Sequence, residues 1–289
     1  MFKNTVKTFT LLASLGGFLV LCGSLVGGPT GMLIGLGLGL VVVGSSYWLS
    51  DTMAVRSARA EPADSPQLAW LRADLDTLAA RAGMQHTPRL FLSPDPQPNA
   101  FATGRNERRA VVCVTAGLLA HLDRDEVRGV VAHEVAHIRH RDILIGSVAA
   151  AVATGISAIA NMAMFAAMFG GSSEDDDRPS PATLLLLSLV APIAATVMQM
   201  ALSRSREYEA DRLGAELAGD PRPLASALRK IELLAQRTPM DVSPAQATAY
   251  IVNPLTGRQV SFAKLFLTHP PTSERIERLG RMATLTPSS

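Results

Sequence analysis

Four long apolar runs without any Asp, Glu, Lys or Arg interrupt the polar parts of this chain. They cover residues 9–28, 31–50, 143–169 and 183–202. A hydrocarbon core of about 30 Å needs roughly 20 apolar residues in helical form, so each run is long enough to cross a membrane. We therefore expect four transmembrane helices, arranged as an N-terminal hairpin and a second pair further along the chain.

Helix and strand periodicity marks the polar segments between and after these runs. Apolar residues at helical spacing predict a helix over 65–83. Three short strands are then expected, at 88–93, 99–104 and 109–115. The next helix should begin at Thr115 or Asp123 and end at His140, since Asp123 and Glu126 have the spacing of a capping box. Further helices are expected at 203–218, 221–237 and 272–283, with a loop-like stretch at 238–270.

These elements predict a mostly helical α+β domain with a small β-sheet, interrupted by the second membrane pair. The expected parts are the hairpin (1–50), the first part of the domain (51–142), the second pair (143–202) and the second part of the domain (203–289). The polar portion amounts to roughly 200 residues, which is enough for one compact water-facing domain.

Composition and charge narrow the class of protein. Hydrophobic residues make up 48% of the 289 residues, more than a soluble protein usually needs. The net charge of +2 is too small to indicate nucleic acid binding. The two cysteines, Cys22 and Cys113, lie in a predicted span and a predicted strand, so they are interpreted as packing residues rather than a disulfide.

The distribution of basic residues predicts the orientation in the membrane. Basic residues flank the outer ends of both span pairs: Lys3, Lys7, Arg56, Arg59, Arg139, Arg141, Arg204 and Arg206. The two connecting loops, at 27–31 and 170–181, carry little or no positive charge. Because positive residues stay on the cytoplasmic side, both termini and the whole polar domain are expected in the cytoplasm.

The strongest chemical motif is the segment HEVAH, residues 133–137. On a helix, His133 and His137 lie one turn apart and can present two imidazoles to one ion. Glu134 then lies beside the open coordination position, where it can act as a general base. The motif predicts one catalytic Zn²⁺ per chain.

A catalytic zinc site needs a third protein ligand. Glu207, in the helix that follows the fourth span, is the candidate that the orientation returns to the same side of the membrane. Glu209 is its nearest competitor but would face about 200° away on that helix. Asp211 lies one turn after Glu207 and could accept the outer N–H of a zinc histidine. A solvated charged helix is the alternative reading of both acidic residues.

In order along the chain, the motifs are NAFATG, VTAGLL, HEVAH, SREYEAD, NPLTG and THPPTSERIERL. With them the chain resembles the HtpX-type heat-shock membrane proteases, relatives of the prenyl-protein CaaX endopeptidases within the gluzincin metalloproteases. The resemblance implies a gluzincin-like domain. It also implies His133, His137 and Glu207 as zinc ligands, Glu134 as general base and Asp211 as the carboxylate behind them.

The resemblance implies a substrate-binding edge strand as well. Asn99, Ala100 and Phe101 match the strand with which gluzincins hold the substrate backbone, although NAF could also be a plain strand start. His269 could stabilise the oxyanion on the scissile carbonyl or lie in an ordered surface turn. Arg275 could pair with a carboxylate in the site or lie on the surface of a helix.

We therefore expect a membrane-bound zinc endopeptidase of the bacterial inner membrane that cleaves misfolded or damaged membrane proteins on the cytoplasmic side. Its partners would be membrane-protein substrates and the lipid bilayer, without nucleic acid; the sequence leaves the oligomeric state open. Two alternatives are a CaaX-type processing protease and a non-catalytic membrane scaffold in which zinc is structural.

Overall fold

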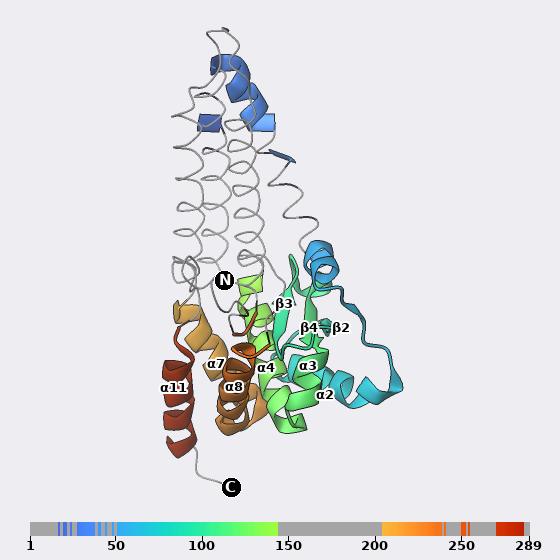
Figure 1. The fold of residues 1–289 in the computed structure, drawn as a ribbon, viewed down its shortest axis with the longest axis vertical. Helices are drawn as coiled ribbons and strands as arrows, with labels where there is room; N and C mark the ends of the chain where they lie inside the picture. Colours follow the sequence, from blue (N-terminus) through green and yellow to red (C-terminus); the bar gives the residue numbers. More distant parts are fainter. Residues whose placement is uncertain are drawn as a thin grey trace.

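The fold is seen in a computed structural model of the chain (Figure 1). It describes residues 28–37, 51–143, 204–238 and 270–285, with isolated residues between 17 and 48 and at 240, 250–252 and 254. The predicted span 183–202 lies wholly outside the described residues, and the spans 9–28 and 143–169 lie mostly outside them. Of the span 31–50, residues 31–37, 40, 41, 44 and 48 are described. Among the residues that are described, no helix is both long and apolar enough to cross a membrane.

A four-stranded mixed sheet forms one layer of the domain. Its strands are β1 (Glu61–Pro62), β2 (Arg89–Ser93), β3 (Ala100–Thr103) and β4 (Val111–Thr115), in the order β1-β2-β4-β3. The central strand β4 pairs parallel with β2 and antiparallel with β3, and all its residues are buried. The three predicted strands are confirmed. The two-residue β1 was not predicted, because a strand of two residues is too short to show an alternation of apolar and polar positions.

Helices cover this sheet and extend away from it. The labelled α-helices are α2 (Ala69–Arg81), α3 (Ala116–His121), α4 (Arg124–His140), α7 (Arg204–Ala218), α8 (Pro221–Ala235) and α11 (Thr272–Leu285). Residues 28–37 and 51–57 are helical as well. Short 3-10 turns precede α2 and β4, at η1 (Pro66–Leu68) and η2 (Glu107–Arg109). The prediction of a mostly helical domain with a small sheet is confirmed.

Helix α4 lies at the centre of the domain. It packs against α7 and α8 on one side and against β3 and α2 on the other, as the layers in Figure 1 show. Its valines Val127, Val130, Val131 and Val135 are buried in the core. A helix enclosed in this way can hold its polar side chains only where other groups meet them, which makes it a rigid base for a site.

The two predicted starts of the HEVAH helix belong to two separate helices. Thr115 caps α3, and its hydroxyl accepts a hydrogen bond from the Leu118 N–H at 3.1 Å. Asp123 caps α4 in a complete capping box: its carboxylate accepts from the Glu126 N–H, and that of Glu126 accepts from the Asp123 N–H. The chain is extended at Leu122, so the helix is broken there.

Candidate metal centre

Two histidines face each other from consecutive turns of α4. The Nε2 atoms of His133 and His137 lie 3.1 Å apart, and the two rings are nearly perpendicular at 88°. His133 is fully buried and His137 is half-buried. The i, i+4 spacing thus directs one nitrogen of each imidazole to the same point.

Glu207 completes this group from the first turn of α7. One carboxylate oxygen lies 3.7 Å from Nε2 of His133, and the other lies 3.5 Å from Nε2 of His137. Ligand atoms of the three residues all lie within 4.8 Å of one another. The competitor Glu209 is exposed, and its carboxylate pairs with Arg212 at 2.9 Å. It therefore faces away from the histidines, as its position on the helix predicted.

These residues fit a zinc ion by chemistry and by spacing. Zinc prefers imidazole nitrogen and carboxylate oxygen, and bonds of about 2.1 Å place tetrahedral ligand atoms about 3.4 Å apart. The observed separations of 3.1, 3.5 and 3.7 Å are close to that value. Three protein ligands would leave a fourth position for water or substrate, as catalytic sites do.

The side chains around the two histidines also suit a cation. Burial lowers the pKa of His133 to about 4, so its imidazole is neutral, as a metal ligand must be. Burial alone would lower the pKa of His137, but the carboxylates of Glu207 and Asp142 outweigh burial and raise it to about 9. The two carboxylates therefore favour a positive charge, such as that of a metal ion, between His133, His137 and Glu207.

A close approach between two helices brings Glu207 to the histidines. Gly214 of α7 lies directly against α4: a Cβ atom there would be 2.8 Å from Cα and 2.9 Å from N of His133. Real Cβ atoms essentially never make contacts under 3.0 Å. Sequence analysis did not single out Gly214, because its role depends on a helix that is distant in sequence.

Each histidine has a carboxylate at its other ring nitrogen. Oδ1 of Asp211 lies 3.0 Å from Nδ1 of His133, as sequence analysis expected for one of the two histidines. Oδ2 of Asp142 lies 3.4 Å from Nδ1 of His137. Sequence analysis missed Asp142. It follows Arg141, whose left-handed φ of 60° ends α4 and turns the chain back toward His137.

Arg275 of α11 lies inside the site rather than on the helix surface. It is 1% exposed, and its guanidinium donates two hydrogen bonds to Asp211, at 2.9 and 2.7 Å. Its Nη1 donates to the Ile251 carbonyl at 2.8 Å and lies 3.7 Å from Glu207. Burial raises the pKa of the Asp211 carboxyl, but Arg275 outweighs burial and lowers it to about 2. Asp211 therefore stays ionised.

Glu134 is buried next to the histidines and points towards the sheet. Burial raises its pKa to about 7, although His137 and Arg275 lower it in part. The backbone of Ala102 in β3 forms a hydrogen bond with this carboxylate and also lowers its pKa. A carboxyl group with a pKa near neutrality can both accept and return a proton.

The edge of β3 is the predicted substrate strand, and another part of the chain contacts it. The Ile251 N–H donates to the Ala100 carbonyl at 3.0 Å, and Tyr250 forms a β-bridge with Phe101. The Asn99 side-chain amide donates to the Val252 carbonyl at 2.9 Å. The predicted edge strand therefore lies beside Glu134, and at Ala100 its outer edge is paired within the chain.

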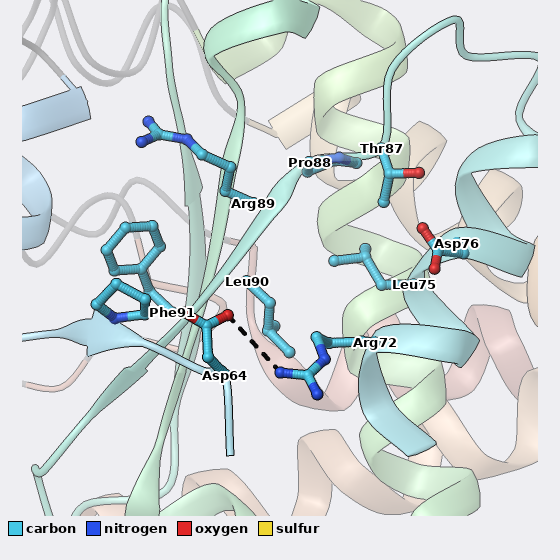
Figure 2. Close-up of a pocket in the computed structure, with 10 residues that line it drawn as sticks. Asp64, Arg72, Leu75, Asp76, Thr87, Pro88, Arg89, Leu90 and Phe91 are labelled. Carbon is cyan, nitrogen blue, oxygen red and sulfur yellow. Dashed lines mark ion pairs between the residues drawn. The ribbon is translucent and has the colours of Figure 1, made fainter. Parts of the chain in front are cut away.

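His269, the predicted oxyanion donor, is outside the described residues. A cavity of about 430 Å³ lies between α2 and β2, and Figure 2 shows the ion pair of Asp64 with Arg72 at its side. None of the residues lining the cavity belongs to the metal group. Arg72 also donates a hydrogen bond to the Ala63 carbonyl, so its charge is used in contacts within the fold. We therefore assign no chemistry to this cavity.

Comparison with known proteins agrees with this geometry. The sequence pattern of Peptidase family M48 matches residues 65–283. The Protease HtpX homolog of Persephonella marina is 48% identical over 97% of this chain and 98% of its own length. Protease HtpX of Legionella pneumophila strain Corby is 45% identical over 96% and 99%.

A solved structure shares the fold. The crystal structure of S. mikatae Ste24p matches with a TM-score of 0.50 and 20% identity. The match covers 96% of this chain, which spans 66% of the length of that one.

Proposed function

The chain belongs to peptidase family M48 and is a membrane-bound zinc metalloprotease related to HtpX, and we propose that it cleaves misfolded or damaged membrane proteins. In this proposal the cuts are made on the cytoplasmic side of a bacterial inner membrane. The arrangement of His133, His137 and Glu207, with ligand atoms within 4.8 Å of one another and Glu134 buried beside them, is the observation that supports zinc-dependent proteolysis. The choice of membrane-protein substrates rests on the four apolar runs and on the relationship to HtpX.

We propose that these three residues hold the zinc ion and that Glu134 is the general base. Zinc, when bound, supplies a Lewis acid that polarises the scissile carbonyl and activates water for attack. Glu134 accepts the proton of the attacking water and returns it to the leaving amine. Its pKa of about 7 suits both transfers, and the Ala102 backbone holds the carboxylate in place.

Charged groups behind the ligands fix their orientation. A carboxylate oxygen of Asp211 lies 3.0 Å from Nδ1 of His133, and one of Asp142 lies 3.4 Å from Nδ1 of His137. Carboxylates in these positions favour the tautomers whose Nε2 atoms are directed at the metal. Arg275 holds Asp211 through two hydrogen bonds, and its own charge is compensated by that carboxylate. These are positioning residues, since they act through the ligands.

The substrate backbone would add as a strand at the outer edge of β3. We propose that Asn99, Ala100 and Phe101 take part, because β3 lies against the helix that carries Glu134. The pairing of Ala100 with Ile251 implies that substrate either displaces this contact or binds further along, near Ala102. We also propose His269 as an oxyanion donor, since it precedes the helix that carries Arg275 into the site.

The proposed topology has two hairpins of membrane helices and a cytoplasmic domain built from 51–142 and 203–289. The support for it is the four apolar runs and the distribution of basic residues at their ends. Helix α4 ends at His140, just before the third apolar run begins. The site would therefore face protein segments close to the membrane surface.

Substrate trapping tests the choice of substrates. The Glu134→Gln variant, expressed in its own membrane, should retain membrane proteins that the wild type cleaves and releases. These should be identified by co-purification and mass spectrometry, with the zinc-ligand variant Glu207→Gln as control. Recovery of only soluble proteins with the Glu134→Gln variant would contradict the proposal.

A further inference from the structure

One end of the sheet gathers arginine side chains. The parallel strands β2 and β4 both begin there, and β3 ends there, because Val111 pairs with Arg89 on one side and with Thr103 on the other. The loop that joins β3 to β4 lies at the same end. It carries the arginines Arg105, Arg108 and Arg109, of which Arg108 and Arg109 are exposed.

The end of an apolar run contacts this loop. The guanidinium of Arg105 lies 4.4 Å from the centroid of the Trp48 ring, and its Nη1 donates to the Trp48 carbonyl at 3.2 Å. Trp48 is 60% exposed and stands near the end of the predicted span 31–50. Tryptophan and arginine together are typical of the membrane–water interface, where an amphipathic ring and a cation meet the headgroups.

The segment after Trp48 is fixed on the sheet. Asp51 is buried and pairs with Arg89 at 3.3 Å, while Ala58 packs with Phe101. Figure 1 shows this segment, in blue, beside the upper end of β3. The contacts hold the arginine loop next to the point where the apolar run meets the domain.

The positive charges at this end exceed the negative ones. Asp51 is compensated by Arg89, and a carboxylate oxygen of Glu107 accepts hydrogen bonds from the backbone N–H groups of Gln85 and His86. The three arginines of the loop therefore outnumber its one carboxylate, Glu107, whose backbone hydrogen bonds leave its charge in place. Basic residues next to a membrane attract anionic lipids, each contributing about 1 kcal/mol near the surface.

We propose that Trp48, Arg105, Arg108 and Arg109 form a binding surface for the headgroups of anionic phospholipids. The surface would hold the β3–β4 loop against the membrane. Because β3 runs from this loop to the side of Glu134, a bound lipid would also fix the height of the active site above the bilayer. Neither the zinc chemistry nor the choice of substrate requires such a surface.

Fluorescence quenching in nanodiscs tests the proposal. The chain has two tryptophans, and Trp70→Phe leaves Trp48 as the single reporter. Equal small fractions of brominated phosphatidylglycerol or brominated phosphatidylcholine are added to otherwise identical nanodiscs. We expect Trp48 to be quenched more by the anionic lipid. The ratio of the two lipid association constants should fall by roughly fivefold for each arginine replaced by glutamine.

A matched variant separates this surface from general charge. Arg105→Gln/Arg108→Gln/Arg109→Gln should lose the anionic preference. The control Arg222→Gln/Arg229→Gln/Arg281→Gln, which removes three exposed arginines from α8 and α11, should keep it. A ratio of one in the Trp70→Phe chain would mean that the surface faces water or another protein, and would overturn the proposal. Equal ratios in the two triple variants would do so as well.

Discussion

At the scale of single residues, the candidate site is a set of buried charges that compensate one another. His133 and His137 each have a carboxylate at the outer nitrogen, and Arg275 neutralises Asp211. A buried charge without a partner is costly, so every member of this set depends on its neighbours. The loss of stability or of zinc affinity on substitution should therefore depend on which charged partner a residue contacts, and less on its distance from the metal.

Asp142 is the carboxylate that sequence analysis missed, and we expect it to set the affinity for zinc. Asp142→Asn should lower that affinity by about 10–100-fold, because Nδ1 of His137 loses its ionised acceptor. Competition with a fluorescent zinc chelator measures the change. Asp125→Asn makes the same charge change at an exposed position of α4 and should have little effect. Equal affinities in the two variants would count against a role for Asp142.

Arg275 should matter for stability as well as for the site. Arg275→Met leaves Asp211 as a buried carboxylate without its main partner, which typically costs about 3–5 kcal/mol. The double variant Arg275→Met/Asp211→Leu removes both charges and should recover part of that loss. Unfolding in detergent, with a chelator present, measures both free energies. A single variant as stable as the wild type would refute the prediction.

At the scale of secondary-structure elements, the contact of α7 with α4 determines the geometry of the site. These helices bring Glu207 to the two histidines, and Gly214 permits their close approach. The site thus depends on a helix-packing distance that no local pattern encodes.

Gly214→Ala should push α7 away from α4 and weaken zinc binding. The new Cβ would meet backbone atoms of His133, which cannot move like a side chain. We expect a loss of zinc affinity of at least about tenfold, comparable to the loss of an orienting group. Gly280→Ala in α11 is the matched control, since nothing lies within 4 Å of a Cβ there. If the two alanine variants bind zinc equally well, the helix contact does not control the site.

Much of the secondary structure could be predicted from the sequence. Periodicity located the strands and most helices, and the capping box at Asp123 and Glu126 marked the start of α4. The helical spacing of HEVAH and of Glu207 with Asp211 indicated which side chains share a face. The strand order and β1 could not be predicted, because the pairing of β2 with β4 joins strands that are not consecutive in the chain.

At the scale of the whole molecule, the site is assembled from parts of the chain that are far apart in sequence. Helices α4, α7 and α11 and the Ile251 segment meet at Arg275 and Asp211. For Arg275 the sequence left two readings open, pairing with a carboxylate in the site or a place on the helix surface, and the pairing with Asp211 is the one observed. The role of Asp142 was not predicted, because its contact with His137 forms only in the folded chain. Since the second apolar pair separates α4 from α7 in sequence, we expect membrane insertion to help form the site.

The most direct test of a zinc protease with Glu134 as base combines metal content with proteolysis. Purified wild type and Glu134→Gln should each hold one zinc per chain, while only the wild type cleaves a generic peptide. Glu207→Gln should hold less zinc and should also lose cleavage. Cleavage by Glu134→Gln at the wild-type rate, or full zinc content in a His137→Ala/Glu207→Ala chain, would contradict the assigned site.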